Sequence, residues 1–272
     1  MLKSNTIRLF WWNEIKMMHK AKENYGDMLG KYLVEKISSK KVTWVFPKHF
    51  SVYNYFQPIY ATIGSILAHV NENCIVWGSG IISQTIPVKK AKFLAVRGPQ
   101  TRKYLIGLGY DVPEVYGDPA LLLPNYYHPE VAKKYKFGIV PHYNDFKAMS
   151  QLYVNQDDVL VIDLMTNDIE AVTRQFLQCE KVVSTSLHGI IVSHAYQIPA
   201  VWVQFSDKLF GDGIKFQDYF ESVEMQSYVP SINSEKMTNS DMEQLFESYP
   251  SLPKTERIEA LKNGLMAVCP FV

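Results

Sequence analysis

Three hydroxyl residues, a histidine and a glycine lie close together at residues 184–189, and their types are suited to acid–base chemistry. The hydroxyl residues occupy positions 184–186, His188 follows after one leucine, and Gly189 comes next. Hydroxyls are favoured at the start of a helix, and a glycine lets a ligand come close to the backbone. An imidazole at such a place can exchange a proton with a bound group.

The expected position of His188 is the first turn of a helix, where unpaired N–H groups carry a partial positive charge. Such a site attracts a phosphate or a carboxylate without a basic side chain. The same field disfavours imidazolium, so we expect a neutral ring in the empty site. A bound dianion favours the protonated ring, which suits a general acid. The alternative is a histidine that only caps or packs at the helix start.

The residues around this cluster predict a strand, a helix and a second strand. Val182–Val183 indicates a buried strand, residues 187–197 a helix that Pro199 closes, and residues 200–203 the next strand. In such a βαβ unit, ligands bind beyond the carboxyl ends of the parallel strands. His194 lies six residues further along the helix, so we expect it to point away from His188 and to be packed or exposed.

Further polar residues follow expected strands or open expected helices. A polar turn at residues 24–27 opens a helix, and residues 78–80 (Gly-Ser-Gly) follow a strand but lack the third glycine of a dinucleotide fingerprint. Arg97 follows another strand, where its guanidinium could clamp a carboxylate or phosphate or form an interdomain salt bridge. Asp118 reaches the same sheet edge, and Lys215 lies where a loop enters a short helix.

Composition limits the class of protein. The 272 residues carry a net charge of +1 and are 47% hydrophobic, which is ordinary for a globular chain and argues against a nucleic-acid binder with a broad basic face. The three cysteines have no metal-ligand spacing, so no metal site is expected and a reducing cytoplasm fits. The N-terminal segment is neither a signal peptide nor a membrane span.

Strands and helices alternate in two runs, which predicts an α/β protein. A polar stretch at residues 125–136 separates the runs, so we expect two Rossmann-like domains with parallel sheets facing a cleft, covering residues 1–127 and 128–272. Locally, the pattern predicts a helix over residues 62–68 and a strand over residues 114–117. Helix N-caps are expected at Asn167 and Ser240.

The combined motifs resemble the polysaccharide pyruvyl transferase family. The matching segments are NYGD (24–27), WGSG (77–80), RGPQT (97–101), YGDPALLLP (116–124), STSLHGIIVSHAYQIPAV (184–201) and KFQDYF (215–220). The resemblance implies a GT-B-like fold and transfer of the enolpyruvyl group of phosphoenolpyruvate onto two sugar hydroxyls, with release of phosphate. The sugar would belong to a cell-surface polysaccharide or its lipid-linked precursor. Several members carry Arg where this chain has Ser186.

The resemblance and the residues together give a set of candidate roles. His188 is the acid/base candidate, and Asp27 and Asp118 are candidates for binding or activating sugar hydroxyls. Candidate substrate-binding residues are Asn24, Gly78, Ser79, Arg97, Ser184, Thr185, Ser186, Leu187, Gly189 and Lys215. Phosphoenolpyruvate is the expected co-substrate and no further cofactor is expected. The acceptor half is expected to be residues 1–127 and the donor half residues 128–272.

Two other functions remain open at this point. The same architecture serves nucleotide-sugar glycosyltransferases, because fold does not fix function. A catalytically silent sugar-binding protein of a polysaccharide assembly complex is the second alternative, and Ser186 favours it. Acceptor choice is assigned to the aromatic region Tyr53–Tyr60, whose rings could stack on a sugar. A lipid-linked acceptor would bring the protein to the inner face of a membrane as a peripheral partner.

Overall fold

The computed structural model describes residues 6–49, 56–207, 211–233 and 235–272, and it shows a mixed α/β chain with two parallel sheets. The first sheet has the strand order β3-β1-β4-β5-β6 and the second the order β11-β10-β7-β8. Every pairing within these two sheets is parallel. The predicted α/β class with parallel sheets is therefore confirmed. Residues 53–55 of the aromatic region lie outside the described residues.

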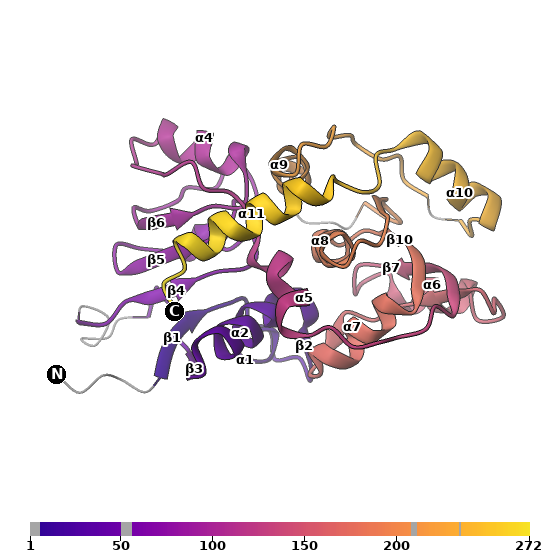
Figure 1. The fold of residues 1–272 in the computed structure, drawn as a ribbon, viewed down its shortest axis with the longest axis horizontal. Coiled ribbons are helices and arrows are strands. Elements are labelled where there is room, and N and C mark those ends of the chain that lie inside the picture. The colour runs from indigo at the N-terminus through magenta and orange to yellow at the C-terminus, as the bar shows by residue number, and fades with distance from the viewer. Residues whose placement is uncertain (1–5, 50–55, 208–210, 234) are drawn as a thin grey trace.

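The first sheet and its helices come from the first half of the chain (Figure 1). Its elements are β1 (Thr6–Phe10), α1 (Glu14–Met18), α2 (Tyr25–Ser38), β3 (Lys41–Trp44), β4 (Ile59–Ala61), η1 (Leu67–His69), β5 (Cys74–Trp77), β6 (Lys92–Ala95), α4 (Pro99–Gly107), η2 (Pro119–Leu122) and α5 (Leu123–Tyr126).

The second sheet is formed by the part of the chain after the polar stretch. The elements in this second half of the chain are β7 (Tyr135–Val140), α6 (Phe146–Leu152), β8 (Val159–Val161), α7 (Ile169–Leu177), β10 (Cys179–Ser184), α8 (Leu187–Ala195), β11 (Ala200–Trp202), α9 (Ile214–Ser222), α10 (Asn239–Ser248) and α11 (Thr255–Ala267). A short antiparallel pair, β2 (Glu23–Asn24) with β9 (Met165–Thr166), joins the two halves.

One hydrophobic core cluster runs through both halves. It contains Tyr25 and Leu29 of α2, Leu121 of η2 and Ile190 of α8, all fully buried. The Tyr25 hydroxyl also shares a hydrogen bond with Thr173 of α7 at 2.8 Å. Because apolar burial and a buried hydrogen bond both cross between the halves, α2 and α8 are held in a fixed relation to each other.

Helix α11 returns to the first sheet, so the terminal helices do not all pack with the second half. In Figure 1 it runs from beside α9 across to the strands of the first sheet, where the C-terminus lies. Trp77 of β5 donates its indole N–H to the carbonyl of Leu265 at 2.9 Å, and Phe271 packs edge-on against Trp77. The boundary at residue 127 remains a prediction, but part of the last segment belongs to the first core.

Several local predictions are wrong. Residues 62–66 form no helix, because Gly64 has a φ of 101° and only Leu67–His69 make a helical turn. Residues 114–117 contribute one isolated bridge between Val96 and Tyr116 and form no strand. The N-caps lie at Asp168 and Thr238, close to the predicted Asn167 and Ser240. The predicted cap Asn167 instead accepts a hydrogen bond from the Glu23 amide.

Candidate functional site

Helix α8 begins directly after strand β10, which places His188 in its first turn as expected. The N-cap is Ser186, with extended backbone and no side-chain capping bond. Ser184 supplies the local hydrogen bonds, because its Oγ accepts from the Ser186 amide at 3.0 Å and donates to the Ser186 carbonyl at 2.9 Å. Thr185 is buried, and its amide donates to the carbonyl of Val140 on the neighbouring strand. These bonds fix the turn that presents His188.

Gly189 has a structural use that the sequence did not indicate. A Cβ at this position would lie 2.2 Å from Ser184 Oγ and 3.1 Å from Val140. The missing side chain therefore makes room for Ser184, not for a ligand. Leu187 is buried among apolar neighbours. The residues of this turn thus have structural roles at the start of α8, and His188 is the side chain among them that can exchange a proton.

The imidazole of His188 faces the carboxylate of Asp118. His188 Nε2 lies 3.7 Å from Asp118 Oδ2, which is too long for a hydrogen bond but close enough for the carboxylate to attract a protonated ring. Neither atom has a hydrogen-bond partner among the described residues, although both are buried. The side chain of His188 keeps 13% of its surface exposed. Two unpaired buried polar atoms this close together are suited to bind a hydroxyl group beside them.

Asp118 is held in place by the turn that it caps. Its Oδ1 accepts a hydrogen bond from the Ala120 amide at 2.9 Å, at the start of η2. Pro119 follows at the first position of this turn, where a missing N–H costs nothing. Since Oδ1 is occupied by the backbone, Oδ2 is the oxygen directed toward His188.

The start of helix α2 lies against the same histidine. Asn24 is the N-cap, and its Oδ1 accepts from the Gly26 amide at 3.0 Å. A Cβ on Gly26 would come within 2.1 Å of His188 Nδ1, so only glycine fits there. The Tyr25 amide donates to the Leu164 carbonyl at 2.7 Å, which fixes this turn to the second half. Helices α2 and α8 therefore meet at His188.

Asp27 lies in the first turn of α2, among other charged groups. Burial raises the pKa of Asp27 to about 7, which His188 and Lys215 oppose and Glu14 and Glu23 reinforce. A carboxyl group with a pKa near neutrality can exchange a proton at physiological pH. Asp27, predicted from the sequence, therefore lies in electrostatic contact with His188.

Lys215 reaches this group of side chains from helix α9. Burial and, to a smaller extent, the positive charge of Arg97 lower the pKa of Lys215 to about 8, although Asp27 opposes the shift. The helix begins after Gly213, whose φ of 81° is favoured by glycine. Lys215 is thus a partly buried cation near Asp27, and it can attract an anionic ligand.

Arg97 forms a salt bridge between the two halves of the chain, and a salt bridge was the alternative that the sequence left open for this residue. Its Nε donates to Asp218 Oδ2 at 3.0 Å, Nη1 to Ser65 Oγ at 2.7 Å and Nη2 to the Ile81 carbonyl at 2.8 Å. The side chains of Arg97 and Asp218 are both 0% exposed. Removing one partner of such a buried pair costs about 3–5 kcal/mol of folding stability. The guanidinium is therefore engaged within the protein, and anion clamping by Arg97 remains a prediction.

The glycine turn at residues 78–80 packs against neighbouring backbone. Gly78 has a φ of 95°, and a Cβ there would lie 2.3 Å from Pro119, next to Asp118. Ser79 is fully buried, its carbonyl accepts from the Arg97 amide, and its hydroxyl has no partner among the described residues. The turn therefore supports the backbone that carries Asp118 and Arg97.

Three residues that the sequence analysis did not assign join the charged group. Glu14 of α1 contributes to the field at Asp27, and Lys20 pairs with Glu14 at 2.9 Å while its Nζ lies 3.5 Å from the centre of the Tyr143 ring. Burial lowers the pKa of His142, and Lys215 lowers it further. His142, which follows β7, is therefore in electrostatic contact with Lys215.

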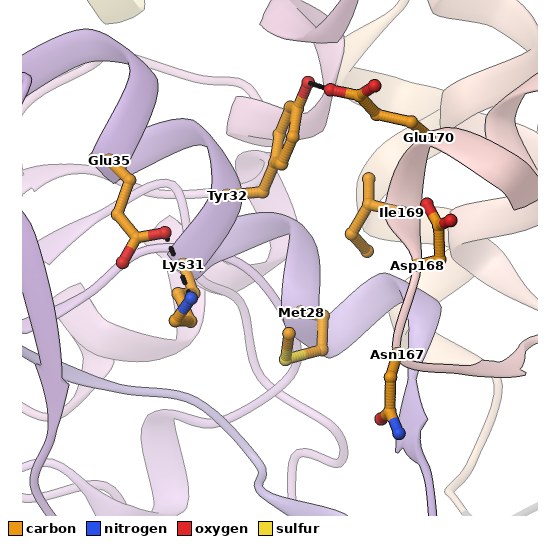
Figure 2. A pocket seen from close by; sticks show the side chains of 8 residues that line it. All are labelled: Met28, Lys31, Tyr32, Glu35, Asn167, Asp168, Ile169 and Glu170. Carbon is orange, nitrogen blue, oxygen red and sulfur yellow. Dashed lines mark hydrogen bonds and ion pairs between the residues drawn. The ribbon is translucent and has the colours of Figure 1, made fainter.

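A separate pocket of about 370 Å³ lies on another face of α2, between this helix and the start of α7 (Figure 2). Tyr32 donates to Glu170 at 2.8 Å across it, and Lys31 pairs with Glu35 at 3.0 Å along one wall. None of the predicted site residues lines this pocket. Its polar contacts link the two halves, whereas the acid–base side chains gather around His188.

Comparison with known proteins assigns the family. Residues 24–207 match the family described as polysaccharide pyruvyl transferase. The chain is also 37% identical over 203 residues to an uncharacterized protein of Acanthamoeba polyphaga mimivirus, covering 72% of this chain and 69% of that protein. The chain belongs to the polysaccharide pyruvyl transferase family. The resemblance read from the short motifs is therefore confirmed.

In this pyruvyl transferase family member, the matched residues include most of the candidate site but not all of it. Asn24, Asp27, Asp118 and His188 fall within residues 24–207, whereas α9 with Lys215 lies beyond. Asp218, the partner of Arg97, was missed although its segment KFQDYF had been recognised. The sequence signal that could have identified Asp218 is its spacing from Lys215, because the two residues lie one turn apart on one helix. Within the described residues, no helix is long and apolar enough to span a membrane.

Proposed function

We propose that this chain is a pyruvyl transferase that uses phosphoenolpyruvate as donor and a sugar of a cell-surface polysaccharide or its lipid-linked precursor as acceptor. The observation that carries the proposal is the meeting of His188 with Asp118 at 3.7 Å, beside the start of α2. Membership of the family supports transfer to a polysaccharide. The partly buried cation Lys215 and the N-terminus of α8 favour an anionic donor.

The reaction balances without a further co-reactant. Two bonds form between C2 of the donor and two sugar oxygens, while the bond from C2 to the phosphate oxygen and the π bond between C2 and C3 break. The two sugar hydroxyls lose two protons. One proton is balanced by the proton added to C3, which becomes a methyl group, and the other leaves with phosphate. The products are a cyclic ketal and inorganic phosphate. Each step needs proton transfer near two anionic groups.

Different side chains of the candidate site carry out the proton transfers and bind the anionic groups of the donor. His188 transfers the proton between donor and acceptor, and Asp118 opposite Nε2 stabilises the imidazolium that forms. Asp27 accepts a hydroxyl proton, because its raised pKa of about 7 makes it a base near neutrality. Lys215 and the N–H groups at the start of α8 hold the phosphate and carboxylate. The hydroxyls of Ser184 and Thr185 serve the turn that presents these N–H groups.

The two halves have different roles in this proposal. Residues 1–127 provide the acceptor side with Asp27, and residues 128–272 the donor side with α8 and α9. The substrates lie at the carboxyl ends of the two parallel sheets, in a GT-B-like arrangement. The reaction takes place in the cytoplasm, and the protein approaches the membrane only through a lipid-linked acceptor. It requires neither a resident cofactor nor a nucleic acid.

A turnover assay tests the proposal directly. The purified chain is incubated with phosphoenolpyruvate and a panel of sugars and lipid-linked sugars, and phosphate release and the ketal methyl group are followed by colorimetry and NMR. We expect both products together, and about a 100-fold or greater loss in His188→Ala. His128→Ala is the matched control, because His128 is exposed and stacks on Tyr196. Wild-type turnover in His188→Ala contradicts the role of His188.

Ligand stabilisation separates the proposal from the two alternatives. A donor that binds only the folded state raises the melting temperature. Stabilisation by phosphoenolpyruvate but not by nucleoside diphosphates supports the pyruvyl transferase. The reverse pattern identifies a nucleotide-sugar glycosyltransferase. Stabilisation by sugars alone, without turnover of any donor, identifies a silent sugar-binding protein.

A further inference from the structure

Helix α9 joins the second half of the chain to the first through one fully buried carboxylate. Asp218 Oδ2 accepts from Arg97 Nε at 3.0 Å and from Thr101 Oγ1 at 2.7 Å, and Oδ1 accepts from the Thr101 amide at 2.8 Å. Arg97 and Thr101 belong to the end of β6 and to α4 of the first half. Three hydrogen bonds to a buried carboxylate make a rigid joint.

The surrounding backbone is shaped to admit this joint. A Cβ on Gly98 would lie 1.9 Å from the Asp218 carbonyl oxygen, so α9 packs directly onto the backbone there. A Cβ on Gly80 would lie 2.3 Å from the Arg97 guanidinium carbon. Two glycines in the first half thus leave room for the helix and for the arginine. Both glycines come from the motifs WGSG and RGPQT.

Lys215 lies one helical turn before Asp218 on α9. Residues three apart on a helix share a face, so the joint at Asp218 determines where Lys215 projects. The charged groups that act on Lys215 come from three elements. Arg97 follows β6, Asp27 lies in α2, and His142 follows β7.

We infer that Arg97 and Asp218 are positioning residues that seat α9 on the first half so that Lys215 lies among the acid–base side chains around His188. Arg97 thus acts on the donor through Lys215 and does not touch it. The inference rests on the proposed function for the identity of the donor, but the placement of Lys215 rests on the Arg97–Asp218 ion pair, on the helical spacing of Lys215 and Asp218 and on the coupling of Lys215 to Asp27. It also assigns a use to Asp218 in the segment KFQDYF.

The electrostatic effect of this arrangement can be measured. Burial lowers the pKa of Lys215 to about 8, and the charge of Arg97 contributes to the lowering while Asp27 opposes it. Removing the charge of Arg97 therefore raises the pKa of Lys215. A purely structural role of Arg97 would change stability but would leave the titration of Lys215 where it was.

The test follows the amine of Lys215 without any substrate. Competitive acylation is carried out at a series of pH values, and the extent at Lys215 is read from its peptide by mass spectrometry. In the wild-type chain we expect a midpoint near 8. In Arg97→Met, which removes only the positive charge of the pair, we expect the midpoint to rise by about one pH unit. Arg97→Gln, which keeps a donor for Asp218, should shift it in the same direction.

The matched control is Gln100→Ala. Gln100 of α4 donates to Glu221 of α9 at 2.7 Å, so this variant removes a polar contact between the same two helices without changing the charge near Lys215. We expect its midpoint to stay at the wild-type value. A midpoint that is unchanged in both charge-removing variants overturns the inference. So does failure of both variants to fold, because Arg97 would then be a structural residue only.

A kinetic measurement links the joint to the donor. If phosphoenolpyruvate is the donor, Arg97→Gln should raise its Michaelis constant roughly tenfold and change kcat less, because charge-assisted contacts from Lys215 weaken. If the chain does not turn over phosphoenolpyruvate, the acylation result still stands. Failure of the proposed function and failure of this inference therefore give different results.

Discussion

Gly26 lies directly against the imidazole ring of His188. A Cβ at position 26 would come within 2.1 Å of Nδ1 and 2.4 Å of Cγ, distances that real side chains do not adopt. We therefore expect Gly26→Ala to displace the ring from Asp118 and to lower turnover about 100-fold, since a shift of this size disrupts catalytic geometry. Gly107→Ala is the control, because a Cβ there meets nothing within 4 Å. Full turnover in Gly26→Ala would show that the ring position is unimportant.

The carboxylate that faces His188 can be neutralised without changing its shape. Asp118→Asn keeps the oxygen that caps the Ala120 amide but removes the negative charge opposite Nε2. We expect kcat to fall about tenfold or more while the Michaelis constant for the donor changes little, because imidazolium loses its stabilising partner. Asp168→Asn, at another helix N-cap, is the control. Equal kcat values for the wild-type and Asp118→Asn chains would remove Asp118 from the mechanism.

Asp27 should make the stability of the protein depend on pH in an unusual direction. Its pKa is about 7 in the folded state, above its ordinary value of 3.8, because the carboxylate is buried. The folded state therefore binds more protons than the unfolded state between these values, and this residue makes stability fall as pH rises from about 4 to 7. We expect Asp27→Asn to be more stable than the wild type at pH 8 and to lose this advantage near pH 4. Urea unfolding at both pH values measures the difference; an advantage that is the same at both would refute the assignment.

His194 should contribute to acid sensitivity in the opposite sense. The ring is fully buried, with Nδ1 against the Tyr219 hydroxyl at 3.0 Å and Nε2 against the Ser251 carbonyl at 3.0 Å. Burial lowers the pKa of His194 to about 4, so the unfolded state takes up a proton first and stability falls as pH drops from about 6.5 to 4. The shift corresponds to roughly 3 kcal/mol.

His194→Gln measures this contribution. We expect the variant to be less stable than the wild type at pH 7, because its hydrogen bonds are poorer, but to lose less stability between pH 6.5 and 4. The readout is the slope of unfolding free energy against pH in that interval. Identical slopes in the two proteins would mean that His194 does not titrate as the structure indicates. The exposed His128 again offers a control, since His128→Gln should leave the slope unchanged.

The sequence by itself determined the local geometry around His188. The β-branched strand, the hydroxyl residues and the helix that follows are set by neighbouring residues, so the position of His188 in the first turn of α8 could be predicted. Helical spacing predicted that His194 points away from His188 but left open whether it is packed or exposed, and the structure shows it fully buried. The N-caps of α7 and α10 were missed by one and two residues, because several polar residues near each start compete to cap.

Only the tertiary structure decided which of these side chains meet. Gly26 and His188 are far apart in the sequence, and their contact depends on the shared core between α2 and α8. Arg97 was identified as a strand-end cation, but its partner Asp218 comes from the other half through helix α9, which no local pattern reveals. Residues 62–66 likewise do not form the predicted helix, because Ser65 accepts a hydrogen bond from Arg97 and the Gly64 carbonyl accepts one from the Gly80 amide. Long-range burial and charge pairing outweigh weak local preferences, which is the physical reason why the site was only partly predictable.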